Sequence, residues 1–273
     1  MAGAGLLGLS AVLARSAPAY AWTQDSQALP VPRPSSANVR SYDLEIDDYR
    51  LMVDGRPGKA MAINGTVPGP LLRFREGEDA VIRVTNRLKE IASIHWHGIL
   101  LPPGMDGVPG VSFAGIAPGE TFTYRFPLLQ SGTYWCHSHS GGQELLGVYA
   151  PFVIDPAGPD PVAFDRDYVV LMSDWSFEAP EKIIANLKKQ SGYYNYQKRT
   201  LADLVRDVSA NGWSATLMER LSWSKMRMDP TDFADVTGYT YTYLVNGLTS
   251  DANWTGLFRP GERVRLRFIA AGA

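Results

Sequence analysis

Apolar and polar positions alternate with a period of two in short runs along the first half of the chain. The runs are rich in β-branched and aromatic side chains, and they cover residues 42–53, 79–86, 93–100, 120–126, 132–140 and 147–155. Turn-forming residues separate them, as in NGTVPGP and PPGMDGVPG. Alternating runs with frequent turns are typical of the strands of an antiparallel sandwich or barrel. We therefore expect a mainly β protein.

The period changes in the second half of the chain. The stretch DPAGPDP is typical of a linker, and a strand-like run follows it at residues 167–175. Beyond that run, Thr200 can cap a helix together with Asp203 at the third helical position. The apolar residues that would share one face of this helix are Leu201, Leu204, Val205 and Val208. The 3.6-residue spacing predicts a helical insertion over about residues 180–228, after which strand-like alternation returns in YTYLVNG.

Residues 63–84 and 245–268 form an internal repeat. Both copies open with Asn-Gly, and both carry Gly-Glu before an alternating run. A repeat of this kind indicates two copies of one structural module. We expect residues 39–157 to form the first module and residues 158–273 to form a second, incomplete module that contains the helical insertion.

Composition narrows the possible functions. The net charge is −2 over 273 residues, and no run of Lys or Arg offers a surface for nucleic acid or anionic membranes. One cysteine allows neither an internal disulfide nor a thiolate zinc site. Because of the charge distribution, we expect no nucleic-acid partner.

The N-terminus has the pattern of an export signal. Residues 2–14 are apolar but too short to span a bilayer, and Ala19-Tyr20-Ala21 fits a small-x-small cleavage site. We expect a signal at residues 1–21, a proline-rich lead-in at 22–38 and no transmembrane segment in the mature protein. The expected location is the periplasm.

All four histidines belong to two His-x-His pairs, His95 with His97 and His137 with His139. Side chains at i and i+2 of a strand share a face about 7 Å apart, and a neighbouring strand lies about 4.8 Å away. Two such strands side by side would gather four imidazoles on one patch, which suits one metal ion or a small cluster. Copper, zinc and nickel accept all-imidazole ligation, and the order of affinities favours copper.

The stretches IHWHGI, WCHSH, DGVPG and AINGTVPGP resemble the first cupredoxin domain of a multicopper oxidase. Together with the helical insert and the second repeat copy, they resemble the N-terminal part of the bacterial copper-resistance oxidases of the CopA type. The resemblance implies cupredoxin-like Greek-key β-sandwich domains and half of a trinuclear copper cluster that reduces dioxygen to water. It assigns His95 to a type 2 copper, His97 and His137 to one type 3 copper, and His139 to the other.

The same resemblance places a type 1 copper in a C-terminal cupredoxin domain, expected in cis, where a cysteine lies between two cluster histidines. Ser138 occupies that middle position here. Cys136 shares the face of Ser138, away from the histidines, and we interpret it as a small buried hydrophobic residue. Asp106 corresponds to an acid that passes protons to the cluster, and its alternative role is that of a turn residue that stabilises its own loop.

These expectations describe the N-terminal portion of a periplasmic multicopper oxidase with a role in copper tolerance. Its reductant would be cuprous ion or a phenol. The alternatives are a non-catalytic protein that sequesters copper, an inert cupredoxin scaffold and, more remotely, a zinc hydrolase. Met218, Met226 and Met228 offer thioethers to cuprous ion, but packing within the helical insert is the preferred interpretation.

Overall fold

The structure is a computed structural model that describes residues 38–190, 193–194, 199–226 and 241–272. The predicted export signal and nearly all of the proline-rich lead-in lie outside the described residues.

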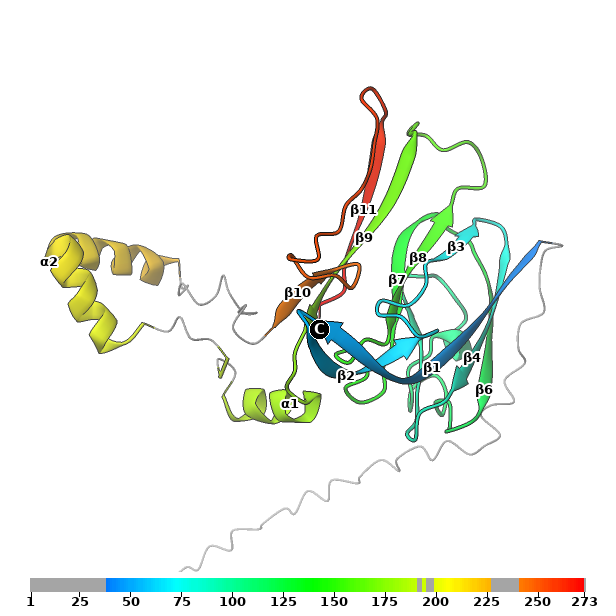
Figure 1. Cartoon of the computed structure of the whole chain (residues 1–273), viewed down its shortest axis with the longest axis horizontal. Coiled ribbons are helices and arrows are strands. Elements are labelled where there is room, and N and C mark those ends of the chain that lie inside the picture. The colour runs from blue at the N-terminus through cyan, green and yellow to red at the C-terminus, as the bar shows by residue number, and fades with distance from the viewer. Residues whose placement is uncertain (1–37, 191–192, 195–198, 227–240, 273) are drawn as a thin grey trace, which may run out of the picture.

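Three sheets dominate (Figure 1), so the prediction of a mainly β protein is confirmed. The first sheet has the order β2 (Arg56–Ile63), β1 (Val39–Val53), β4 (Asp79–Asn86) and β6 (Thr121–Pro127). The second has β3 (Leu72–Arg75), β8 (Tyr149–Asp155), β7 (Gly132–His137) and β5 (His95–His97). The third has β10 (Thr242–Val245), β9 (Arg166–Trp175) and β11 (Val264–Ala270).

The first two sheets enclose the main hydrophobic core. In β1 the buried Leu44 and Ile46 alternate with exposed Asp43 and Glu45, as the period of two requires. Trp96 of β5 is fully buried, and its ring centroid lies 5.1 Å from that of Tyr124. Burial of one such large side chain contributes roughly 1.5–3 kcal/mol. The core therefore fixes β5, although that strand has only three residues.

The opposite face of the second sheet packs against the third sheet. Tyr149 of β8 belongs to a second buried cluster with Leu171 and Trp175 of β9. Its hydroxyl lies 2.8 Å from Oγ of Ser173. Burial raises the pKa of the Tyr149 hydroxyl to about 12. The second sheet is thus covered on both faces, by the main core and by the third sheet.

An ion-pair cluster joins the same two sheets. Asp167 of β9 accepts hydrogen bonds from Arg73 of β3, at 2.8 Å, and from Arg267 of β11, also at 2.8 Å. The side chains of Asp167 and Arg267 are only 6% and 8% exposed. Arg73 also contacts Asp155 of β8 at 2.7 Å. Charges this shielded are stable only when each has its partner.

The internal repeat is confirmed by matching hydrogen bonds. The Asn64 side chain accepts from the Glu45 amide and donates to a carbonyl of β1. Asn246 makes the same pair of bonds to β9, with the Leu171 amide and the Val169 carbonyl. Both asparagines have left-handed φ angles, 52° and 49°, before a glycine, a conformation that Asn tolerates better than most residues.

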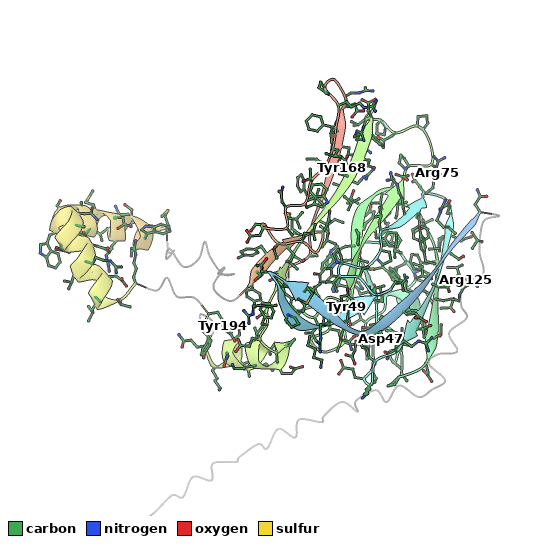
Figure 2. All side chains as sticks on the ribbon, in the orientation of Figure 1. Asp47, Tyr49, Arg75, Arg125, Tyr168 and Tyr194 are labelled. Carbon is green, nitrogen blue, oxygen red and sulfur yellow. The ribbon has the colours of Figure 1, made fainter. Side chains whose placement is uncertain are left out.

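The helices of the predicted insertion are α1 (Pro180–Lys189) and α2 (Leu201–Lys225). Tyr194 lies beside α1 (Figure 2), where its hydroxyl contacts Glu178 at 2.5 Å. Thr200 and Asp203 form the predicted capping box at the start of α2. None of the described helices is long and apolar enough to cross a membrane.

Most of the large apolar side chains of α2 are exposed, and the helix stands away from the three sheets (Figure 1). Leu201 and Val205 are 82% and 70% exposed. Met218 and Met226 are 65% and 54% exposed, so the prediction that they pack inside the insert is wrong. The helix stands away from the sheets, so they do not cover these side chains, and a break at Gly212, whose φ is 78°, also interrupts the continuous helical period. Met228 lies outside the described residues.

Candidate metal centre

The two His-x-His stretches lie side by side because β5 and β7 pair in antiparallel register. His95 stands opposite His137, and Trp96 stands opposite Cys136. Trp96 and Cys136 both point into the main core with no exposed surface. Strand alternation therefore places the histidines of these two strands on the opposite face. The prediction for Cys136 is confirmed, and burial raises the pKa of its thiol to about 12.

The four imidazoles form one cluster. The ring centroid of His95 lies 5.7, 5.5 and 4.9 Å from those of His97, His137 and His139, respectively. One nitrogen each of His95, His137 and His139 lie within 4.8 Å of one another. His97 joins them through its Nδ1 atom, which is 3.2 Å from Nε2 of His137.

His139 lies beyond the end of β7, where the chain turns away from the strand. The fully buried hydroxyl of Ser93 accepts a hydrogen bond from the His139 amide at 3.0 Å. The same hydroxyl lies 2.9 Å from Oγ of Ser140. These bonds fix the backbone at His139 in place of the sheet ladder.

The loop after β5 orients His95. It contains the short 3-10 helix η2 (Pro103–Met105), followed by Asp106. The carbonyl oxygen of Asp106 lies 2.7 Å from Nδ1 of His95, and its carboxylate Oδ1 lies 3.4 Å from the same atom. Because a carbonyl only accepts, the contact selects the form of the neutral His95 ring that has its proton on Nδ1 and its lone pair on Nε2.

Gly107 permits this approach of the loop. Its φ is 78°, and a Cβ atom there would lie 1.8 Å from the carbonyl oxygen of Ile94. No side chain fits in that space. Gly107 therefore allows the loop to pack against the backbone next to His95.

Two contacts of the site were not foreseen from the sequence. The Glu144 carboxylate lies 2.9 Å from Nδ1 of His137. The Trp135 ring stacks on both His97 and His137, with centroid separations of 5.3 and 4.3 Å. Trp135 is the first residue of the WCHSH stretch and lies two positions before His137, so strand alternation alone would place it on the histidine face. Glu144 has no comparable signal.

Two of the four imidazoles, those of His97 and His139, are shifted toward the neutral form. Burial, together with the neighbouring His137 and His95, lowers the pKa of His97 below its ordinary value. The same causes lower the pKa of His139. A neutral imidazole has the lone pair that a metal ion needs.

The donor set fits copper. Imidazole nitrogens suit copper, zinc and nickel, and affinity rises to a maximum at copper. A separation of 3.2 Å between Nδ1 of His97 and Nε2 of His137 suits two ligands of one ion, each at about 2.0–2.1 Å from it. The cluster as a whole is compact enough for metal ions that share ligands or lie close together.

Comparison with known proteins agrees with this geometry. Residues 46–158 match the family model for multicopper oxidase. The chain is 54% identical over 249 residues to a copper resistance protein A homolog of Pseudomonas syringae, covering 91% of this chain and 42% of that protein. It is 51% identical over 253 residues to copper resistance protein A of Escherichia coli, covering 92% of this chain and 42% of that protein. The chain spans about two fifths of the length of these curated relatives.

Solved structures show the same architecture. The blue copper oxidase from Nitrosomonas europaea superposes with a TM-score of 0.61 at 27% identity, covering 86% of this chain and 62% of that one. A laccase from Botrytis aclada superposes with a TM-score of 0.52 at 40% identity, covering 57% of this chain and 30% of that one. With the sequence similarity to copper resistance proteins, these matches establish that the chain belongs to the multicopper oxidase family.

Proposed function

We propose that this chain supplies half of a trinuclear copper centre in an oxidase that couples oxidation of cuprous ion or a phenol to reduction of dioxygen to water. The cluster of four imidazoles on one sheet face supports this proposal most strongly. We assign His97 and His137 to one type 3 copper, because their nitrogens lie 3.2 Å apart. His139 serves the second type 3 copper and His95 the type 2 copper.

Copper bound here would supply one-electron redox chemistry and a place for dioxygen to be reduced. The protein side chains and backbone would orient the imidazole ligands and deliver protons to the site. The Asp106 carbonyl holds the His95 ring with Nε2 free, and the Asp106 carboxylate, 37% exposed, connects the site with solvent. That carboxylate can pass to the cluster the protons that dioxygen reduction consumes. We therefore assign proton transfer to Asp106 as a catalytic residue.

The proposal also covers the division of the chain into domains and its location in the cell. Residues 39–157 form the first cupredoxin module, and residues 158–273 belong to a second. The relatives are longer than this chain, which supports a C-terminal cupredoxin module in cis that carries the other cluster imidazoles and a type 1 copper. Residues 1–21 direct export to the periplasm, where the oxidase contributes to copper tolerance.

The decisive experiment uses a chimera in which this chain replaces the matching part of the Pseudomonas syringae relative. The chain alone and the chimera are loaded with copper, and oxygen uptake is measured with cuprous ion or a phenol. We expect turnover by the chimera only, abolished by His97→Ala. Copper binding without turnover in the chimera would instead favour the sequestering function, which the four imidazoles alone can support.

A further inference from the structure

Glu144 contacts the metal centre without being part of any motif. Its Oε2 atom lies 2.9 Å from Nδ1 of His137. The His137 side chain is 8% exposed and that of Glu144 is 24% exposed. Shielding of this degree limits competition from water, so the contact is a fixed feature of the site.

The turn that carries Glu144 is held from both sides. The neighbouring Gln143 is 1% exposed, and it binds Oγ of Ser138 at 2.8 Å and the carbonyl of Ile91 at 2.8 Å. The turn closes where the Gly147 amide donates to the Glu144 carbonyl at 3.0 Å. A Cβ atom on Gly147 would lie 2.8 Å from the backbone oxygen of Met61. The backbone at Glu144 therefore has little freedom to move away from His137.

The contact selects one form of the His137 ring. A carboxylate only accepts hydrogen bonds, so the proton of neutral His137 resides on Nδ1. Nε2 then carries the lone pair, and this is the atom 3.2 Å from Nδ1 of His97. The ring nitrogen that faces the other imidazoles is thus left able to bind a metal.

His95 obtains the same form by a different means. Its Nδ1 atom is held by the backbone carbonyl of Asp106, which no substitution removes. Nδ1 of His137 lies 2.9 Å from the Glu144 carboxylate and 3.3 Å from the backbone carbonyl oxygen of Ser138, so the side chain is the nearer and the charged acceptor. The carboxylates of Asp106 and Glu144 therefore have different tasks, since the stronger contact to His95 comes from a backbone carbonyl and the stronger contact to His137 comes from a carboxylate.

We propose that Glu144 is a positioning residue of the copper site, which holds His137 in the Nδ1–H form and fixes its ring so that Nε2 faces the bound ion. This inference rests on the proposed function, because it treats His137 as a copper ligand. It adds to that function a residue specific to the turn between β7 and β8.

The first test needs no metal. Nitrogen-15 NMR of the labelled, metal-free chain distinguishes the two ring forms of each histidine. We expect His137 in the Nδ1–H form in the native chain and in Glu144→Gln, since the Gln side-chain oxygen also accepts. A native His137 in the Nε2–H form would overturn the inference.

The second test measures the affinity for cupric ion by competition with a chelator. Glu144→Ala should bind about 10- to 100-fold more weakly, as is usual when a partner of a metal ligand is lost. Glu144→Gln should restore most of the affinity, and Glu120→Ala, at an exposed acid outside the site, should behave as the native chain. Equal affinity of Glu144→Ala and the native chain, or equal loss in the Gln and Ala variants, would contradict the positioning role.

The two tests separate the inference from the function on which it rests. If the native chain and the chimera bind no copper, the proposed function fails, and the ring form of His137 alone decides the inference about Glu144. If copper binds but Glu144→Ala changes nothing, the function stands and the inference fails. If the Ala variant does not fold, the inference is still overturned by an Nε2–H form of His137 in the native chain.

Discussion

His95 and His137 stand directly opposite each other across β5 and β7. The pair is in register because their sequence neighbours Trp96 and Cys136 are also opposite each other, on the buried face. The core therefore sets the geometry of the metal centre. A strand of three residues could not hold this register through its own hydrogen bonds alone.

Substitution of Gly107 should disturb both the fold and copper binding. Gly107→Ala places a Cβ atom 1.8 Å from the Ile94 carbonyl oxygen and must displace the loop that orients His95. Gly110→Ala is the matched control, since its φ is 77° and a Cβ there meets nothing within 4 Å. Both variants should lose about 1 kcal/mol from the left-handed φ.

Gly107→Ala should lose about 1–3 kcal/mol more in urea unfolding, and it alone should bind cupric ion more weakly. Equal behaviour of the two variants would show that the close approach of the loop does not matter to the site.

Asp106→Asn should separate orientation from proton transfer. The backbone carbonyl that holds His95 is retained, so copper content in the chimera should not change. The amide cannot carry a proton at neutral pH, so oxygen uptake should fall by about 100-fold or more. Oxygen uptake is measured with an oxygen electrode, and the copper content of the same sample is measured by metal analysis. Unchanged uptake would return Asp106 to a structural role in its turn.

Cys136 should be unreactive in the folded chain. Its thiol is fully buried, and its pKa is raised to about 12 from an ordinary value of 9.0. A thiol reagent at pH 8 should label the chain in urea but not the native chain. Because the folded pKa is the higher one, the thiol favours folding below pH 9 and this contribution is lost as the pH rises toward 12. Rapid labelling of the native chain would contradict this.

Loss of Asp167 should be costly, because it removes the carboxylate that contacts the buried Arg267 at 2.8 Å and leaves only the more distant one of Asp155, at 3.9 Å. We expect Asp167→Ala to lower the free energy of unfolding by about 3 kcal/mol in urea. Asp43→Ala is the matched control, since Asp43 pairs with Arg83 at an exposed position and should matter little. Similar urea midpoints of unfolding for the two variants would show that the contact between the second and third sheets does not depend on the ion-pair cluster around Asp167.

Much of the site could be predicted from the sequence, because strand alternation is a local property. Period-two spacing placed His95 with His97, and it placed Cys136 on the other face. The capping box of Thr200 and Asp203 was also a local pattern. Contacts made across the fold had no such signal. Glu144 reaches His137 only because a turn returns the chain toward β8, and the exposure of Leu201 follows from how α2 stands relative to the sheets.

The two faces of β7 have different tasks, so the length of that strand matters to both. Residues 132–137 present Trp135 and His137 to the metal centre and Cys136 to the core. Insertion or deletion of one residue ahead of His137 would exchange these faces, burying an imidazole and turning the thiol toward the other histidines. A change of length alters both the core and the metal ligands in one step.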